Sequence, residues 1–514
     1  MAQVNKIDSN VTGLRYAEEA SYKTLPGSPV WKGLEPNSYS DFGGQLQLLS
    51  RNPINDGRQR KKGVVTDLDA SGGFNTDLTQ TNLQDILQGV MFADLERKAE
   101  FGGSGGITNV DGTTEDFEAA SGLDVFAAND LVFGAGFTNA ANNGLHLVSA
   151  TSATALTVTS NLVTETPPST ATLVQVGYQF ASATLDVVVS GSLPRLTRAS
   201  GTKDFTDFGL IPGEWIYVGG DGASTDFVNS ENNGWMRVRS VAASYIEIDK
   251  AGDSAMVAET GTGLTIQIFF GRVLRNRTGS DIVRRTYNLE RTLGAPDDAS
   301  PSQIQSEYLV GALANEFSIN IPTADKVTVD LSFIAADNEQ RTAATGVKSG
   351  SRPTLVDADA FNTSSDFSRI KMSVFTDGDE SPSALFAFLT DITLTINNNA
   401  SPSKAVGTLG NFDVTAGTFE VGGNLTAYFS TVDAITAVRN NSDVTFDIIM
   451  TKANSGIAID VPLIALGDGR LSVEQDQPIT LPLQTDASTG AKIDANLNHT
   501  LLWVFFDYLP TVAE

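Results

Sequence analysis

The sequence of 514 residues contains no cysteine and only two histidines, His146 and His499. The lack of cysteine excludes disulfides, thiolate zinc sites, iron–sulfur clusters and cysteine nucleophiles. Two histidines are too few for a histidine-rich metal site or a set of histidine acid–base catalysts. We therefore expect neither a metal nor a cofactor.

Basic residues and long apolar segments are also scarce. The chain has 34 Lys and Arg against 61 Asp and Glu, which gives a net charge of −27. This charge argues against DNA binding by phosphate neutralisation, which needs clustered Lys and Arg. No segment approaches the roughly 18 uncharged apolar residues that span a bilayer. The first residues lack the pattern of a secretory signal, so we expect a soluble chain made in a cytoplasm.

Enzyme motifs are missing too. Residues 102–106 match Gly-x-Ser-x-Gly only as part of a glycine-rich stretch, and the sequence has no phosphate-binding loop with Gly-Lys-Ser and no His-Glu-x-x-His. Acidic pairs such as Asp377 and Asp379 lie outside any EF-hand pattern. Nothing selects a carboxylate pair for glycoside hydrolysis. We do not expect an enzyme.

The residues that are present favour β structure. Segments 317–322, 327–333, 392–396 and 479–483 alternate apolar and polar residues, as half-buried strands do. The 47 glycines, with many Thr, Ser and Asn, supply turns. One helix is predicted after Thr81 as N-cap, with an apolar stripe that runs from Leu83 to Leu95. A weaker helix is predicted over 431–438.

The middle of the chain contains an internal repeat. Residues 142–148 (Asn-Asn-Gly-Leu-His-Leu-Val) match residues 232–238 (Asn-Asn-Gly-Trp-Met-Arg-Val). An Asn-Gly pair between apolar segments is a strong turn signal, because both residues tolerate positive φ. We expect each copy to form a small β-barrel of strands joined by turns. Residues 102–106 (Gly-Gly-Ser-Gly-Gly) ahead of the first copy resemble a flexible hinge.

A fainter duplication relates the two ends of the chain. Segment 71–79 resembles 416–426, and segment 309–319 resembles 462–473. We interpret this as one domain of strands and a helix copied twice, with both small barrels inserted into the first copy; chance similarity is the alternative. The predicted boundaries are 1–100 and 275–345 for the first large domain, 101–182 and 183–274 for the two inserted β domains, 346–370 for a linker, and 371–514 for the second large domain.

Longer motifs in both large domains resemble the tail tube proteins, or major tail proteins, of long-tailed, siphovirus-like bacteriophages. The segments that carry the resemblance are Gly13–Pro26, Trp31–Tyr39, Arg51–Ile54, Lys62–Gly63, Asp67–Phe74, Leu289–Gly294, Leu463–Arg470 and Asp507–Pro510. The resemblance implies a mainly β fold: a tail-tube β-sandwich or barrel with a flanking helix, here duplicated, plus the two small inserted β-barrel domains.

The resemblance also implies a function. Such proteins form rings that stack into a hollow tail tube, a conduit for genome ejection through which DNA passes without specific binding. Two tube domains per chain would allow three chains to complete a pseudo-sixfold ring; a hexamer is the alternative. The implied partners are other copies of the chain, the tape measure protein, the tail terminator and the tail-tip proteins. The implied location is the virion tail, after assembly in the bacterial host cytoplasm.

The polar faces of the alternating strands are candidates for the tube lumen, because an acidic or neutral wall repels the phosphates of DNA. A solvated outer face is the alternative. The residues predicted to face the lumen are Ser318, Thr328 and Asp330 in the first large domain and Thr393, Thr395 and Glu474 in the second.

One dense cationic segment interrupts the acidic sequence. Arg58, Arg60, Lys61 and Lys62 lie together without interleaved aromatic residues, which makes a nucleic-acid patch a poor interpretation. We expect them to contact an acidic surface on the adjacent ring. A solvated loop, or a local salt bridge to Asp67 and Asp69, is the alternative.

Aromatic residues suggest two further contacts. Tyr16, Tyr22 and Trp31 could anchor an N-terminal arm on a neighbouring subunit, or pack within their own domain. Trp215, Tyr217 and Trp235 could bind carbohydrate if the protein were instead a phage tail or surface adhesin. Strand positions place two of these three in a core.

Overall fold

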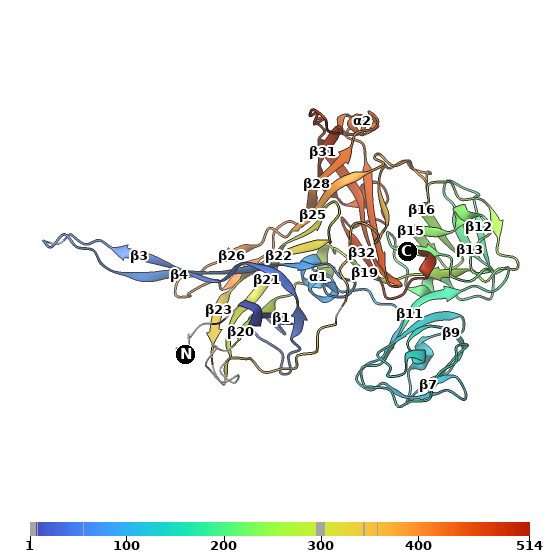
Figure 1. Cartoon of the computed structure of the whole chain (residues 1–514), viewed down its shortest axis with the longest axis horizontal. Helices are drawn as coiled ribbons and strands as arrows, with labels where there is room; N and C mark the ends of the chain where they lie inside the picture. Colours follow the sequence, from blue (N-terminus) through green and yellow to red (C-terminus); the bar gives the residue numbers. More distant parts are fainter. Residues whose placement is uncertain are drawn as a thin grey trace. The chain divides into compact units, whose positions relative to one another are not determined.

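The computed structural model describes residues 7, 9–54, 56–294, 304–342, 345–356 and 358–513. These residues form mostly antiparallel β-strands with two α-helices, so the predicted mainly β fold is confirmed (Figure 1). The chain divides into two units. Unit 1 comprises Met1–Ala93, Arg277–Thr363 and Thr390–Thr426, and unit 2 comprises Asp94–Asn276, Ser364–Leu389 and Ala427–Glu514.

Unit 1 contains the long strands of the first large domain and helix α1. Strands β25 (Leu389–Asn397) and β28 (Glu420–Tyr428) have most of their residues in unit 1. The other elements of unit 1 are β1 (Gly13–Glu18), β2 (Lys32–Leu34), β3 (Pro36–Arg51), β4 (Lys61–Asp77), α1 (Gln84–Met91), β20 (Tyr287–Gly294), β21 (Gln305–Ile321), β22 (Thr328–Ala335), β23 (Asp337–Arg341), β26 (Ser401–Ser403) and β27 (Asp413–Thr415).

Strand β21 belongs to both sheets of unit 1. Its first half pairs with β20 and β23, and its second half pairs with β22 and β25. Gly311, near the change of partners, has φ +64°, and a Cβ there would meet Ala336. The two halves therefore serve the sheets β2–β1–β20–β21–β23 and β3–β4–β22–β21–β25–β28. Leu309 of the first sheet lies against Gly72 of the second, which packs the two as a sandwich.

Helix α1 flanks this sandwich, and its apolar stripe is where the sequence predicts it. Ile86, Leu87, Val90 and Met91 are buried. The predicted start is wrong, however. The helix begins at Gln84, and Thr81 is not its cap, because Thr79 and Asn82 exchange hydrogen bonds in the preceding turn (3.2 and 3.3 Å).

Unit 2 contains the two middle repeats, the last strands of the chain and helix α2. We call residues 101–182 repeat A and residues 183–274 repeat B. The strands β5 to β19 are β5 (Glu100–Gly102), β6 (Ile107–Asp111), β7 (Asp116–Ala119), β8 (Asp130–Ala135), β9 (Gly144–Thr151), β10 (Ala155–Val158), β11 (Thr172–Gln179), β12 (Leu185–Val188), β13 (Arg195–Arg198), β14 (Trp215–Val218), β15 (Gly234–Ala242), β16 (Tyr245–Lys250), β17 (Glu259–Thr260), β18 (Gln267–Phe269) and β19 (Arg272–Arg275). The later elements are β24 (Phe367–Val374), α2 (Asp433–Arg439), β29 (Val444–Lys452), β30 (Ser455–Asp468), β31 (Thr480–Ser488) and β32 (Leu502–Phe506).

The two repeats have the same strand order. Repeat A is ordered β6–β7–β10–β9–β8–β11, and repeat B is ordered β12–β13–β16–β15–β14–β18. Each has its own apolar core, one around Phe117 and Leu156 and the other around Phe208 and Ile246. The sequence repeat is thus also a repeat of topology.

The Asn-Asn-Gly motif has a different role from the predicted hairpin turn. It ends the 3-10 helices η3 (Ala140–Asn142) and η5 (Ser230–Asn232), and Asn143 has φ −96° rather than a positive value. In repeat A, the Asn143 side chain bonds to both backbone groups of Phe137, and Asn142 donates to Glu165. In repeat B, Asn233 and Asn232 make the equivalent bonds to Phe227 and Glu259. The amide side chains, not the turn conformation, close these loops.

Repeat B shares a buried ion cluster with the last strands of the chain. Arg237 is fully buried and donates to Asp249 (2.8 Å) and to Asp460 of β30 (3.2 Å). Burial alone would lower the pKa of Arg237, but the two carboxylates raise it. Removing one partner of such a buried pair costs about 3–5 kcal/mol. The cluster therefore ties repeat B to β30.

An apolar core continues this connection within unit 2. Trp215 and Trp235 of repeat B and Leu131 of repeat A pack in one cluster with Ile449 and Val504 of the later strands. The repeats are therefore packed against the strands that follow residue 371. The domain boundaries given above remain a prediction.

The predicted linker, 346–370, is divided between the two units: its described residues up to Thr363 are largely irregular and belong to unit 1, whereas 364–370 belong to unit 2 and Phe367 begins β24. Trp31 donates its indole N–H to Ser349 O (2.9 Å), and Arg352 pairs with Glu290 (2.6 Å). Phe361 is fully buried and its N–H donates to Leu78 O. The polar composition typical of a linker thus belongs here to a segment that hydrogen bonds and an ion pair hold against unit 1. Residues 343, 344 and 357 lie outside the described residues.

Candidate functional site

Strands β3 and β4 form a long hairpin that carries the cationic segment (Figure 1). Their pairing runs from Pro36 and Thr76 at one end to Arg51 and Lys61 at the other. Arg58 and Arg60 lie in the connection between the strands, and Lys61 and Lys62 begin β4. All four side chains are exposed, and none forms an ion pair among the described residues. The structure therefore gathers the predicted inter-ring residues at the end of one hairpin.

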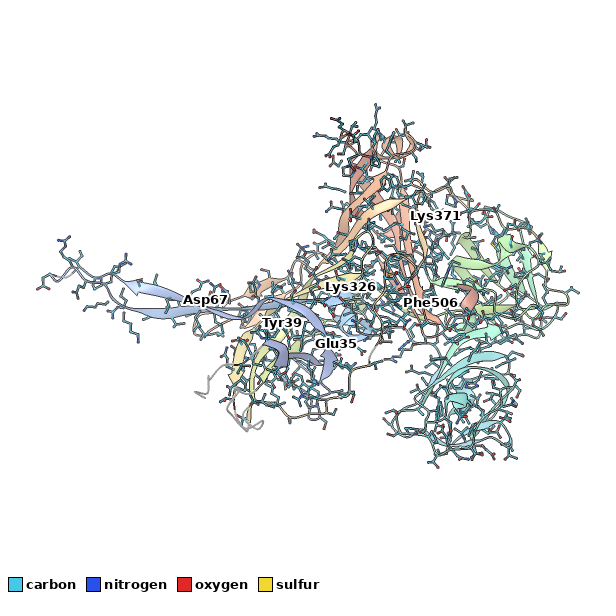
Figure 2. The ribbon with its side chains drawn as sticks, viewed as in Figure 1. Glu35, Tyr39, Asp67, Lys326, Lys371 and Phe506 are labelled. Carbon is cyan, nitrogen blue, oxygen red and sulfur yellow. The ribbon has the colours of Figure 1, made fainter. Side chains whose placement is uncertain are left out.

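The local salt bridge considered for this segment has a different partner. Asp67 and Asp69, farther along β4, pair with Lys404 from the segment that joins β26 to β27 (Asp67 is labelled in Figure 2). The hydrogen bond from Lys404 lowers the pKa of Asp69, and the two carboxylates raise the pKa of Lys404. The two aspartates thus form ion pairs with the β26–β27 segment and not with the cationic residues of the hairpin.

The stem of the hairpin is apolar on both faces, which the sequence analysis missed. Leu48 pairs with Val65 and Leu49 pairs with Val64, and directly paired residues share a face while successive residues alternate. These side chains are 70%, 47%, 64% and 51% exposed, respectively. An isolated two-stranded hairpin is marginally stable in water, and exposed apolar patches mark interaction sites. The hydrophobic segment Leu46-Gln-Leu-Leu49, close to a cationic turn, is the sequence feature from which this apolar stem could have been predicted.

Five of the six residues predicted to face the lumen lie on one face of one sheet in unit 1. Directly paired residues across β4, β22, β21 and β25 form two rows. The first row is Asn75, Asp330, Ser318 and Thr395, and the second is Asp77, Thr328, Asn320 and Thr393. The sixth residue, Glu474, is exposed between β30 and β31 of unit 2 and is not part of this face.

Hydrogen bonds join the residues of these rows into a polar surface. Asp330 accepts from the side-chain amides of Asn75 (2.9 Å) and Asn320 (2.7 Å), and the hydroxyls of Ser318 and Thr395 are 2.9 Å apart. The reverse face of the same strands is buried and mostly apolar. Thr76, Val329, Ile319 and Leu394 form the row between the two polar rows, and Phe74, Leu331, Phe317 and Ile396 form the row on the other side of the first. The sheet therefore presents an ordered, weakly acidic wall that is backed by the core. Lys326 (labelled in Figure 2) pairs with Asp77 at its edge (2.7 Å).

The aromatic residues considered for other contacts are mostly buried. Tyr16 and Trp31 lie within unit 1, where Trp31 packs edge-on against Tyr308, while Tyr22 is partly exposed. Tyr16 and Trp31 therefore pack within their own domain, which was the alternative to anchoring an arm on a neighbouring subunit.

The three aromatic residues considered for sugar binding are also in a core. Trp215, Tyr217 and Trp235 are each less than 10% exposed. The idea that they form an exposed carbohydrate platform is wrong, because they join repeat B to the later strands.

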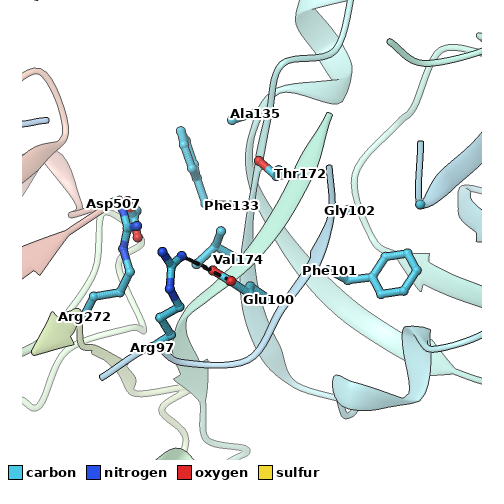
Figure 3. Close-up of a pocket in the computed structure, with 11 residues that line it drawn as sticks. Arg97, Glu100, Phe101, Gly102, Phe133, Ala135, Thr172, Val174, Arg272 and Asp507 are labelled. Carbon is cyan, nitrogen blue, oxygen red and sulfur yellow. Dashed lines mark hydrogen bonds and ion pairs between the residues drawn. The ribbon is translucent and has the colours of Figure 1, made fainter. Parts of the chain in front are cut away.

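A cavity of about 480 Å³ lies within unit 2 between β5, β8, β11 and β19 (Figure 3). Two ion pairs line it: Arg97 with Glu100 (3.1 Å) and Arg272 with Asp507. Burial raises the pKa of Asp507 although Arg272 opposes the shift. Each carboxylate on the wall is thus held by an arginine, and the arrangement shows no acid–base or nucleophilic constellation.

The two histidines are buried. His146 is a core residue of repeat A, its pKa is lowered by burial, and the matching residue of repeat B is the equally buried Met236. His499 is fully buried shortly before β32. Within the described residues, no three His, Asp or Glu side chains form a group that could hold a metal ion.

An exposed apolar hairpin and an ordered polar sheet face are features typical of structural proteins that contact other protein surfaces. A family model for the phage tail tube protein matches residues 9–487, and the chain belongs to this family. It is therefore a component of the virion tail, in a family whose subunits stack into a tube. The sequence has no significant match among curated proteins. Within the part of the chain that the structure describes, no helix has the length and apolarity needed to cross a membrane.

Proposed function

We propose that this protein self-assembles into stacked rings that form the phage tail tube, the conduit for genome ejection. The observation that carries the proposal is the β3–β4 hairpin, whose stem exposes Leu48 and Val65 on one face and Leu49 and Val64 on the other. Burying each such side chain is worth roughly 1.5–3 kcal/mol. A hairpin with two apolar faces gains this stabilisation when it inserts between surfaces of neighbouring subunits.

The cationic end of the hairpin supports contact with the next ring. The chain has a net charge of −27, so the surface of a second copy is acidic on average and attracts Arg58, Arg60, Lys61 and Lys62. Complementary charge guides encounter and fixes register more than it adds affinity. The cations would thus position one ring on the next before the apolar stem is buried.

The polar rows of unit 1 support a lumen wall. Duplex DNA carries about one negative charge per 1.7 Å of its axis, so a wall that attracts phosphate would retain the genome. Asp330, held by Asn75 and Asn320, and the hydroxyls of Ser318, Thr328, Thr393 and Thr395 offer hydrogen-bonding groups without a cluster of cations. Such a wall lets DNA slide without sticking. Glu474 lies off this face, and we assign it another role below.

The order of elements supports two tube domains per chain. When β5–β19 and the short strands β26 and β27 are set aside, two series have the same types of element in the same order. One is β3, β4, α1, β20, β21 and β22, and the other is β25, β28, α2, β29, β30 and β31. Three chains would then complete a pseudo-sixfold ring, whereas six chains would leave the second domain as a decoration. The mass of one ring, three or six times 54.4 kDa, separates these cases.

The tube would be built in the host cytoplasm before it joins the virion. Its ends and interior would contact the tail terminator, the tail-tip proteins and the tape measure protein. These partners follow from the position of a tube in a tail.

The test is a charge reversal at the hairpin end, Arg60→Glu, Lys61→Glu and Lys62→Glu. We expect folded protein, shown by an unchanged circular dichroism spectrum, that no longer forms stacked rings in electron micrographs. The control is Lys492→Glu, which reverses an exposed lysine of unit 2. Normal tubes from the triple variant would remove the inter-ring role of these residues.

A further inference from the structure

The cationic hairpin of unit 1 needs a complementary surface, and unit 2 contains one. The segment between β30 and β31 carries the exposed apolar side chains Leu471, Val473 and Ile479 together with Glu474 and Asp476, and the exposed Asp468 ends β30. Ser472 and Thr480 pair across it, so Val473 and Ile479 are the next residues along its two arms. We call residues 468–480 the acidic loop.

Neighbouring elements extend the apolar surface of the acidic loop. Ile479 O accepts from Phe429 N–H (3.0 Å), and Phe388 O accepts from Tyr428 N–H (3.1 Å), which brings the exposed Tyr428 and Phe388 alongside. Gly469 lies next to Val438 of α2, and the exposed Val432 and Asp433 lie at the start of that helix. In Figure 1, α2 and β31 lie at the same end of unit 2.

The two surfaces match in charge and in apolar character. Residues 51–62 of the hairpin contain five basic residues and one acidic residue. The acidic loop contains three acidic residues and one basic residue, Arg470. Both surfaces place these charges beside exposed aliphatic side chains, which is the arrangement of an apolar interface core with a charged rim.

Other exposed surfaces match the hairpin less well. The polar rows of unit 1 carry Asp77 and Asp330 but no large apolar side chain. Leu355 and Val356 are exposed near Glu35, but Leu355 is already packed over Gly33. The acidic loop is therefore the better receptor.

We propose that the β3–β4 hairpin of one subunit docks on the acidic loop of a second copy of this chain. The inference rests on the proposed tube assembly and identifies the surface that receives the hairpin. It assigns Glu474 and Asp476 to the rim of this contact, opposite Arg60, Lys61 and Lys62. Val64 or Leu49 then lies against Val473 and Ile479.

Cysteine cross-linking tests the contact directly, because the native chain has no cysteine and gives no background. Val64→Cys and Val473→Cys are combined in one chain, assembled and oxidised. We expect a ladder of covalent dimers and higher multimers on a non-reducing denaturing gel, and none from either single variant. The matched control combines Val64→Cys with Val356→Cys, which should give no ladder.

The outcomes separate this inference from the proposed function. Wild-type protein that forms no tubes contradicts the proposed function. Tubes in which Val64→Cys cross-links to Val356→Cys, or in which the Val64→Cys, Val473→Cys protein gives only monomers, contradict the docking site and leave the tube intact.

A charge swap provides a second readout that misfolding cannot mimic. Glu474→Lys with Asp476→Lys should block tube formation alone, as the hairpin reversal does. Combined with Arg60→Glu, Lys61→Glu and Lys62→Glu, it should restore most of the pelleted tube fraction. A combined variant that assembles no better than either parent would overturn the pairing.

Discussion

At the residue scale, buried and half-buried polar side chains fix the loops of the two repeats. Glu259 accepts hydrogen bonds from Val228 N–H (2.6 Å), from Asn229 N–H and side-chain amide, and from the Asn232 side chain (2.7 Å). Glu165 accepts from Asn139 and Asn142 in the same way in repeat A. A single carboxylate thus satisfies several backbone and side-chain donors in each loop.

Replacing Glu259 by Gln should destabilise unit 2 by about 1–2 kcal/mol. The side-chain NH₂ of the glutamine would face the N–H donors that now bond to the carboxylate, and these hydrogen bonds would be lost. Burial alone would raise the pKa of Glu259, but its hydrogen bonds lower the pKa below the ordinary 4.5. Because the pKa of Glu259 is lower in the folded protein than in the unfolded chain, the ionised carboxylate stabilises the fold above about pH 4.5. This stabilisation is lost as the pH falls through the pKa of the folded state. Thermal unfolding measured from pH 7 to pH 3 should therefore show a difference in the free energy of unfolding between wild type and Glu259→Gln that shrinks as the pH falls below the ordinary 4.5.

The matched control for this prediction is Glu231→Gln, which makes the same charge change in the same loop. Glu231 lies in η5, and none of the loop bonds described above uses its side chain. Equal effects of the two substitutions, or a gap that widens in acid, would contradict the role given to Glu259.

At the element scale, the polar sheet face of unit 1 is the proposed wall of the lumen. Thr328 on β22 and Thr393 on β25 both lie opposite Asn320 on β21. Changing both to Lys should leave the fold intact, since both side chains lie on the face away from the core. It should make assembled tubes retain short duplex DNA at about 50 mM salt and release it near 200 mM.

The measurement is co-sedimentation of labelled duplex with tubes, followed by nuclease digestion. DNA inside the bore should be protected. The control is Thr154→Lys with Ser200→Lys, at exposed positions of the two repeats, from which any bound DNA should be digested. If the Thr328→Lys, Thr393→Lys tubes bind no more DNA than wild type, or if their DNA is fully digested, this face does not line the bore.

Much of this element could be predicted from sequence, because alternation has a fixed geometric meaning. Ser318, Thr328 and Asp330 fall on one face since period two leaves no other choice, and Thr393 and Thr395 join them when β25 pairs with β21. Pattern cannot say which strands are neighbours, so the row from Asn75 to Thr395 could not be predicted. Glu474 ends the alternating stretch Leu471-Ser-Val-Glu, but this stretch lies between β30 and β31 rather than in a strand of the sheet, so alternation gives it the wrong place.

The hairpin and the helix start show a different limit. Leu48 and Leu49 face opposite sides of a two-stranded ribbon. Two adjacent leucines in a sequence predict a buried strand, so their exposure could not be predicted. The start of α1 depends on the exchange between Thr79 and Asn82, which competes with capping by Thr81. The exposure of the hairpin and the start of α1 both depend on contacts that cannot be predicted from the periodicity of the sequence.

At the scale of the whole molecule, the chain combines a strongly acidic composition with one cationic apolar hairpin. A net charge of −27 favours mutual repulsion of free copies, and under the proposed function the hairpin provides the local exception through which copies associate. The repeats add mass to unit 2 without a catalytic constellation, and Arg237 and Trp215 bind repeat B to the later strands. In the proposed function, shape and the pairing of copies do the work.

Electron microscopy of the purified wild-type protein over a range of concentrations tests this claim most directly. The account predicts hollow tubes of uniform bore, built from rings that repeat along the axis, at concentrations where the hairpin-reversed variant stays unassembled. Protein that remains monomeric at every concentration, with the hairpin still exposed to solvent, would contradict it.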